Sequence, residues 1–233
     1  MNKAPEQLRQ RIVTIIPLRG IAFLLIMLAV FLQADIAFSD DTFHIDQSTL
    51  KQATDKWGKE AQSRLLAWEN LIRSDQNNSD REKLEKVNAF INKIPYGEDI
   101  SIWGVADYWA TPVEFLGRGA GDCEDYAIAK YFTLRTMGIP DQKLRVTYVK
   151  AMQLDRTHMV LTYVNKPGDE PLVLDNLDKS IKPASERHDL IPIFSFNGTE
   201  LWMAQQRGQG ESTDSSRLKP WRNLLKRMSE HKS

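Results

Sequence analysis

The first half of the chain carries apolar residues at helical spacing. From Asp46 to Ile72 they recur every three or four positions, as on the buried face of a helix. They are Trp57, Ala61, Leu65, Trp68 and Ile72. After a polar break, Asp80 can cap a second helix, which Pro95 and Gly97 end. The apolar stripe of this second helix is Leu84, Val87, Ile91 and Ile94.

Two more helices are expected before residue 140. Thr111-Pro112-Val113-Glu114 forms a capping box with proline at the first helical position, and glycines at 117 and 119 end this short helix. The next helix is expected from Cys123 to Met137, where a glycine and then a proline end it.

After residue 140 the apolar period changes to two, which is typical of strands. We expect strands over residues 144–151, 158–165 and 172–176, with a turn at 166–169. A hairpin is expected over 194–202, with Asn197-Gly198 as its two-residue turn. Helices followed by an antiparallel sheet predict the α+β class.

The N-terminal segment has the pattern of an export signal. Four basic residues precede residues 21–32, a run of twelve without a polar side chain. This run is shorter than the about 20 residues that span a bilayer, and it suits the core of a secretory signal. We expect residues 1–39 to be a signal peptide cleaved near Ser39. The alternative is an N-terminal membrane anchor, if the apolar run extends back through Ile15.

Length, charge and cysteine content limit the possible domain organisation and partners. Residues 40–210 suit one domain, and residues 211–233 form a basic C-terminal tail. The tail either forms an amphipathic helix that docks on the domain or on a membrane surface, or it frays in solvent. The formal net charge is zero, so nothing points to a nucleic-acid partner. A single cysteine excludes an internal disulfide.

That cysteine, Cys123, lies in the acidic block Gly121-Asp122-Cys123-Glu124-Asp125. A free cysteine is often a small buried hydrophobe. The charged neighbours argue against deep burial, because ionised carboxylates rarely enter a core without partners. The alternative is a nucleophile, which needs a base and a group that orients this base. Its backbone N–H is a candidate oxyanion donor, and a second donor could come from residues 103–109.

His158 is the candidate base because it opens an expected strand, in Arg156-Thr157-His158-Met159. The other three histidines lie just past the leader, in a charged loop and in the tail. They are His44, His188 and His231.

Asp175 ends the next expected strand and is the candidate orienting group. If 166–169 is the connecting loop, Val160 lies opposite Asp175, and His158 is a diagonal neighbour of Asp175 on the same face. A slip of two residues would place His158 and Asp175 directly opposite, still on one face. Asp175 can then fix the imidazole tautomer, so that Cys123, His158 and Asp175 form a triad.

The acids beside Cys123 oppose a thiolate, because nearby like charges raise the pKa of a thiol. Two carboxylates that bind a hard dication would reverse the field at the sulfur. We therefore hypothesise that Asp122 and Glu124 bind Ca²⁺, which oxygen ligands favour over Zn²⁺. In the alternative, these acids are solvated or cap the helix.

Four segments together resemble the bacterial transglutaminase-like cysteine proteinases, above all their periplasmic adhesin-cleaving members. They are DYWATP from Asp107, GDCEDYAIAKYF from Gly121, HMVL from His158 and VLDNL from Val173. The likeness runs in order from Trp57 to Trp202. It implies a papain-like, transglutaminase-type fold, with Cys123 as nucleophile, His158 as base and Asp175 as orienting group. It also implies Ca²⁺ dependence through Asp122 and Glu124.

The resemblance further implies a cysteine endopeptidase of the periplasm. Such enzymes cut a large surface adhesin in its N-terminal region, near a pair of alanines, and release it during biofilm dispersal. The periplasmic domain of an inner-membrane receptor that senses cyclic di-GMP inhibits them. Two alternatives stay open from the residues alone: an acyl transferase or amidase with the same triad, and a non-catalytic, Ca²⁺-stabilised binding module.

Overall fold

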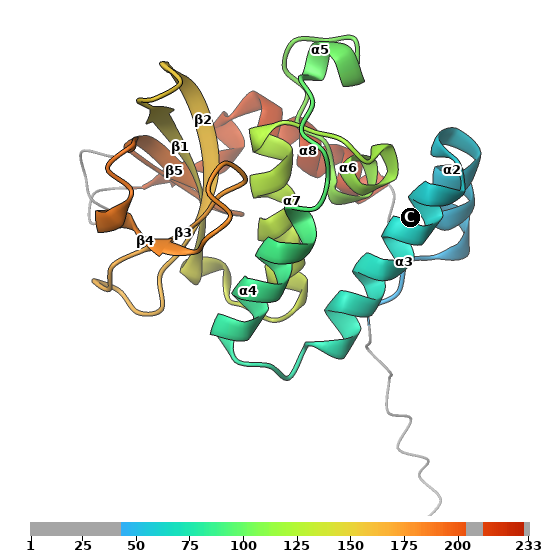
Figure 1. Cartoon of the computed structure of the whole chain (residues 1–233), viewed down its shortest axis with the longest axis horizontal. Coiled ribbons are helices and arrows are strands. Elements are labelled where there is room, and N and C mark those ends of the chain that lie inside the picture. Colours follow the sequence, from blue (N-terminus) through green and yellow to red (C-terminus); the bar gives the residue numbers. More distant parts are fainter. Residues whose placement is uncertain (1–42, 204–211, 231–233) are drawn as a thin grey trace, which may run out of the picture. The chain divides into compact units, whose positions relative to one another are not determined.

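The computed structural model describes residues 43–203 and 212–230, which form a group of helices and one sheet (Figure 1). The helices are α2 (Gln47–Trp57), α3 (Lys59–Ser74), α4 (Asp80–Ile91), α5 (Asp99–Ile102), α6 (Pro112–Arg118), α7 (Cys123–Thr136) and α8 (Lys219–Glu230). The strands are β1 (Leu144–Ala151), β2 (Arg156–Tyr163), β3 (Leu172–Leu174), β4 (Lys182–Pro183), β5 (Leu190–Phe196), β6 (Glu200–Met203) and β7 (Thr213–Asp214).

The expected signal peptide or anchor, residues 1–39, lies outside the described residues. Among the helices of residues 43–203 and 212–230, none has the length and apolar character needed to cross a membrane.

The apolar stripe that predicted one helix from Asp46 to Ile72 is divided between two. Gly58 lies between α2 and α3 with a φ of +85°, a conformation that glycine adopts without a side-chain clash. The expectation of one continuous helix was therefore wrong. The stripe itself is buried in α3, where Leu65, Trp68 and Ile72 face the core. In α2 the buried residues are Leu50 and Ala53, so the stripe predicted across the glycine belongs mainly to α3.

Capping fixes where the next helices begin. Ser79, and not Asp80 as expected, is the N-cap of α4, because it forms a capping box with Glu82. The predicted capping box of α6, between Thr111 and Glu114, is confirmed. Gly119 ends α6 in the left-handed conformation, with a φ of +73°.

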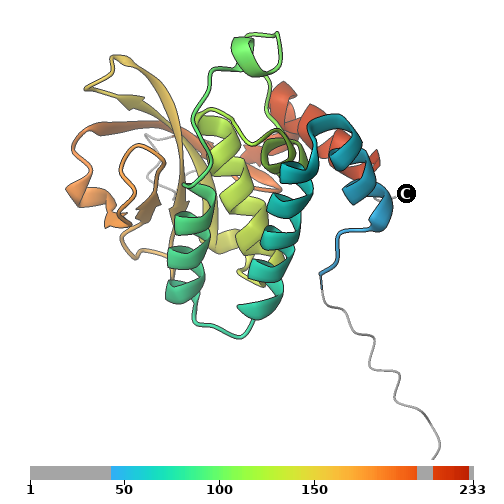
Figure 2. The ribbon, with the colours of Figure 1, turned by 45° about the vertical axis from the view of Figure 1, so that its right-hand side comes forward.

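Helix α7 is the central helix of the structure. It packs on β1 and β2 of the sheet and on helices α4 and α6 (Figures 1 and 2). Trp68 of α3 donates its indole N–H to the hydroxyl of Thr133 on α7 at 2.8 Å. The sequence therefore places Cys123 at one end of a helix that is held from several directions.

The sheet has the order β4-β3-β2-β1-β5-β6-β7, and each neighbouring pair is antiparallel. The α+β class is thus confirmed. In the β2–β3 pair, Leu161 lies opposite Leu174 and Thr162 opposite Val173. This is the first of the two alignments considered from the sequence, in which His158 is a diagonal neighbour of Asp175.

The hairpin after β5 has a longer turn than expected. Strand β5 ends at Phe196 and β6 begins at Glu200, so three residues connect them instead of Asn197-Gly198 alone. The buried side-chain carbonyl of Asn197 accepts the backbone N–H groups of Thr199 (3.0 Å) and Glu200 (2.9 Å). This side-chain turn replaces the tight two-residue turn.

Helix α8 docks part of the C-terminal tail on the core. Trp221 is fully buried and stacks on Phe132 of α7, with ring centroids 5.5 Å apart. Arg227 lies over the Tyr108 ring at 4.6 Å and donates to the Trp109 carbonyl. Of the alternatives for the tail, the docked amphipathic helix agrees with the structure. The domain limits at 39 and 210 stay a prediction.

Candidate active site

Cys123 is half-buried and is the first residue of α7. Its thiol donates to Oε2 of Glu124 at 3.0 Å, and its sulfur also accepts a hydrogen bond from the backbone of Met159. Met159 directly follows His158 on β2. The structure therefore brings the sulfur to the end of β2 from which the candidate base projects.

His158 and Asp175 form a buried pair, 2% and 1% exposed. Nε2 of His158 lies 2.8 Å from Oδ1 of Asp175. The same carboxylate oxygen accepts the backbone N–H groups of Asn176 (2.6 Å) and Leu177 (3.1 Å). Burial alone would raise the pKa of Asp175, but the hydrogen bond and charge of His158, with Arg187, hold this pKa well below its usual value. Asp175 is thus an anion that accepts from the imidazole.

The other histidines of the described residues lie elsewhere. His44 is exposed and its Nδ1 lies 3.1 Å from Oε1 of Glu69. His188 is exposed in the loop before β5. His231 lies outside the described residues.

Five carboxylates surround the start of α7 and can hold a metal ion in two overlapping sets. One set is Asp99, Asp107 and Glu124, and the other is Asp99, Asp122 and Asp125; in each, the possible ligand atoms lie within 4.8 Å of one another. The two acids chosen from the sequence, Asp122 and Glu124, belong to different sets. Asp99 connects the two sets.

These acids are crowded and only partly hydrogen-bonded. Burial, with the neighbouring negative charges, raises the pKa of Asp122 to about 10 and that of Asp99 to about 6. Burial also raises the pKa of Asp125 well above its usual value. Three buried oxygens have no hydrogen-bond partner within the described residues: Oδ1 of Asp99, Oδ1 of Asp122 and Oδ2 of Asp125.

Unpaired buried oxygens of several adjacent acids are what a hard dication would satisfy. Sulfur and imidazole ligands are absent from both sets, which favours an oxygen-binding ion over Zn²⁺. Asp122 occupies the N-cap position of α7 but makes no side-chain capping bond, and it is buried. The alternative that Asp122 simply caps the helix or is solvated therefore does not agree with the structure.

Sequence reasoning missed Asp99, Asp107 and Asp125 as candidate ligands. Asp99 begins the four-residue helix α5, and Asp107 lies on the irregular segment after it, where no periodicity predicts which side chains meet. Asp99 accepts the backbone N–H of Tyr108, at 2.5 Å, and Asp125 accepts that of Ala110, at 2.7 Å. The only available signal was the number of acids within and on both sides of the aromatic segment 103–109.

The acidic cluster also acts on the thiol. Burial and the charge of Glu124 raise the pKa of Cys123, with a smaller effect of Asp122 in the same direction. Two of the three acids expected from the sequence to oppose a thiolate, Glu124 and Asp122, therefore do so in the structure.

The chain is similar to a known protein family and to solved structures. Residues 60–211 match the family model described as bacterial transglutaminase-like cysteine proteinase BTLCP. No curated protein matches the chain.

Three solved structures of Legionella pneumophila LapG are each 42% identical to the chain. The EGTA-treated form has a TM-score of 0.70, covering 78% of this chain and 96% of its own. A second structure of LapG has a TM-score of 0.69, covering 78% and 94%. The calcium-bound form has a TM-score of 0.67, covering 79% and 99%. On the family match and this identity, the chain belongs to the bacterial transglutaminase-like cysteine proteinases and is a cysteine peptidase.

Proposed function

We propose that this protein is a calcium-dependent periplasmic endopeptidase that cuts the N-terminal region of a large cell-surface adhesin. The observation that carries the proposal is the meeting of two groups at one end of β2. The Cys123 sulfur lies against the Met159 backbone, and the adjacent His158 is held by Asp175 at 2.8 Å. A nucleophile, a base and an orienting group are what peptide hydrolysis through an acyl-enzyme requires.

In the proposed reaction, His158 takes the proton of Cys123 and the sulfur attacks the peptide carbonyl. The peptide C–N bond breaks, and His158 gives its proton to the departing amine. A water molecule, deprotonated by His158, then splits the thioester and releases the acid and the free thiol. Asp175 accepts from Nε2 throughout, so Nδ1 is the ring nitrogen that exchanges protons with the sulfur. The backbone N–H of Cys123, at the start of α7, is the proposed oxyanion donor.

The acidic cluster is the proposed Ca²⁺ site. Asp122 and Glu124, with Asp99, Asp107 and Asp125, offer oxygen ligands only, and three of these oxygens are buried without a partner. The calcium-bound LapG structure, 42% identical to this chain, supports the choice of ion. Bound Ca²⁺ would supply positive charge that offsets the carboxylates raising the thiol pKa.

Export, the adhesin substrate and the control of activity are also parts of the proposal. The basic start and short apolar run of residues 1–39 support export to the periplasm, with cleavage or anchoring of this segment. The likeness to adhesin-cleaving members of the family supports a large adhesin as substrate, whose release promotes biofilm dispersal. It also supports inhibition by an inner-membrane cyclic-di-GMP receptor.

The decisive test is cleavage of the purified N-terminal region of the host's adhesin by wild type, Cys123→Ala and His158→Ala. Both variants should lose cleavage, and EGTA should have the same effect on the wild type until Ca²⁺ is restored. His188→Ala is the matched control, because this exposed histidine should leave cleavage unchanged. Adhesin cleavage by Cys123→Ala would refute the proposal that the protein is a cysteine endopeptidase.

Two further measurements separate the alternatives. Adding a primary amine and analysing the products by mass spectrometry distinguishes water from an amine as acyl acceptor. Alkylation of Cys123 followed by peptide mapping, with and without Ca²⁺, reports whether metal binding changes the reactivity of the sulfur. A thiol that stays inert in both conditions would favour a binding module.

A further inference from the structure

Arg187 is a buried charged residue that the triad and the acidic cluster do not include. It follows a short 3₁₀ turn, Ala184–Glu186, between β4 and β5, and is only 4% exposed. Its Nη2 donates to Oδ2 of Asp175 at 2.7 Å. A buried guanidinium thus contacts the carboxylate that holds His158.

The two oxygens of Asp175 have separate tasks. Oδ1 lies against Nε2 of His158 at 2.8 Å, and Oδ2 accepts from Arg187 at 2.7 Å. Because an ionised carboxylate is only an acceptor, Nε2 of His158 must carry the proton in this pair. The backbone N–H groups of Asn176 and Leu177 hold Oδ1, and the Arg187 donor is the side-chain bond that holds Oδ2. Restraint at both oxygens limits rotation of the carboxyl group and keeps Oδ1 in line with the imidazole. Arg187 is also among the groups that keep the pKa of Asp175 low.

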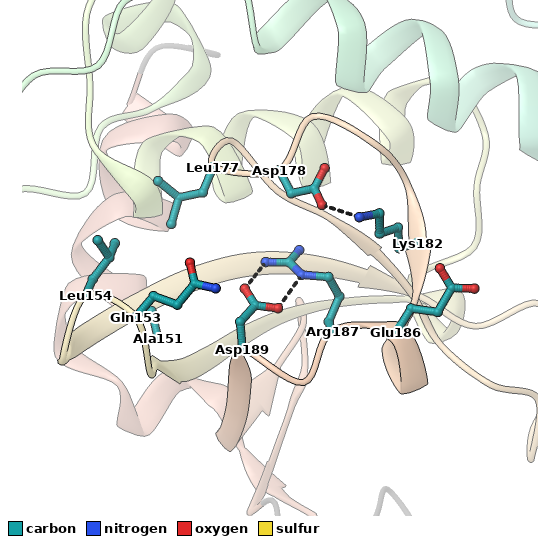
Figure 3. A pocket seen from close by; sticks show the side chains of 9 residues that line it. All are labelled: Ala151, Gln153, Leu154, Leu177, Asp178, Lys182, Glu186, Arg187 and Asp189. Carbon is teal, nitrogen blue, oxygen red and sulfur yellow. Dashed lines mark hydrogen bonds and ion pairs between the residues drawn. The ribbon is translucent and has the colours of Figure 1, made fainter.

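Arg187 is itself held in place by Asp189. Nε and Nη2 of Arg187 donate to the two oxygens of Asp189 at 2.9 and 2.8 Å, in the fork geometry shown in Figure 3. The backbone carbonyl of Asp189 accepts the N–H of Met152, just after β1. The loop before β5 is thus tied both to Asp175 and to the β1–β2 hairpin.

Stability alone is a weak reason for this arrangement. Removing two charges from water is unfavourable in general, and apolar replacements of buried ion pairs are often neutral or stabilising. Nη1 of Arg187 is buried without a hydrogen-bond partner among the described residues, which adds to the cost. Fixing the geometry of a working carboxylate accounts for a buried arginine at this place.

We propose that Arg187 is a positioning residue of the peptidase, which acts through Asp175 to hold the His158 imidazole in its reactive tautomer and orientation. Asp189 anchors Arg187. This inference rests on the proposed triad of Cys123, His158 and Asp175.

The kinetic test compares Arg187→Met, Arg187→Lys and His188→Ala in cleavage of the adhesin N-terminal region with saturating Ca²⁺. Arg187→Met should lower kcat about tenfold to a hundredfold, as expected for the loss of a hydrogen bond between charged groups, and should leave KM unchanged. Arg187→Lys keeps the charge and should recover a large part of kcat. His188→Ala, one residue away and exposed, should match the wild type. An unchanged kcat in folded Arg187→Met, or a loss confined to KM, would overturn the proposal.

A second readout needs no substrate. In wild-type protein labelled with ¹⁵N-histidine, the His158 signals should show the proton on Nε2, and in Arg187→Met they should show a mixture of tautomers. If Arg187 has a purely structural role, Arg187→Met should lower the melting temperature and leave the His158 tautomer unchanged. That result would contradict the proposal. Should Arg187→Met fail to fold, Asp189→Asn decides: kcat lowered by about threefold or more at constant KM supports the proposal, and kcat unchanged overturns it.

Cys123→Ala and His158→Ala separate this inference from the proposed function. If either variant stays active, the triad is wrong whatever Arg187 does. If both are inactive and Arg187→Met has the wild-type kcat and tautomer, only the role of Arg187 is refuted.

Discussion

Trp221→Ala tests whether α8 is part of the cooperative fold. The Trp221 side chain is fully buried and contacts three aromatic rings from the rest of the domain. Their centroids lie 5.1 Å away for Phe196, 5.5 Å for Phe132 and 5.7 Å for Tyr131. Replacing a buried tryptophan by alanine in such a site costs about 3–5 kcal/mol, against a total stability of about 5–15 kcal/mol.

The assay is equilibrium unfolding in urea, followed by circular dichroism and by tryptophan fluorescence. With a slope of about 2 kcal/mol per molar urea, the midpoint should fall by about 1.5–2.5 M, in a single transition seen by both probes. Arg222→Ala is the matched control, because this exposed residue of α8 should change stability by less than about 0.5 kcal/mol. If Trp221→Ala shifts the midpoint no more than Arg222→Ala does, α8 is an independent tail and the packing argument is wrong.

Three other perturbations have defined outcomes. Asp99→Asn should raise the melting temperature in EGTA, because it removes one of several crowded carboxylates. It should also reduce the further rise in melting temperature on adding Ca²⁺, and a rise as large as that of the wild type would contradict the role of Asp99 as a ligand. The hydrogen bond from Lys86 lowers the pKa of Asp75, so this pair stabilises the fold above the unfolded pKa of about 4 and stops doing so as the pH falls through the lower folded value. Lys86→Met should therefore cost about 1 kcal/mol in urea unfolding at pH 7, and the difference from wild type should disappear in acid. Thr111→Ala should cost about 1 kcal/mol in the same assay, because the capping box of α6 is lost.

The His158–Asp175 pair could be predicted because its determinants are local. A turn signal at 166–169 sets the alignment of two strands, and the period of two decides which side chains share a face. The alignment found, with Leu161 opposite Leu174, follows from those two facts. The bounds of α7 were predictable for similar reasons. A glycine before the helix indicated its start at Cys123, and a glycine and a proline after it indicated its end.

The candidate ligands Asp99 and Asp107, and also Arg187, could only be found in the folded structure. Asp99 reaches Asp122 and Asp125 from the short helix α5, more than twenty positions earlier, so no spacing along the chain relates them. Arg187 reaches Asp175 from a loop beyond β4, and an arginine in a charged loop is usually solvated. Gly58 was misread because apolar spacing continues across it, and only its positive φ marks the break.

The burial of His158 affects how inhibition experiments on this protein should be interpreted. Diethyl pyrocarbonate acylates imidazoles that it can reach, and His158 is 2% exposed, whereas His44 and His188 are exposed. The reagent should consequently label those two rings first. Inactivation that develops with their labelling would report on groups other than the base, and mass-spectrometric mapping of the carbethoxy groups is needed before such a result is assigned to His158.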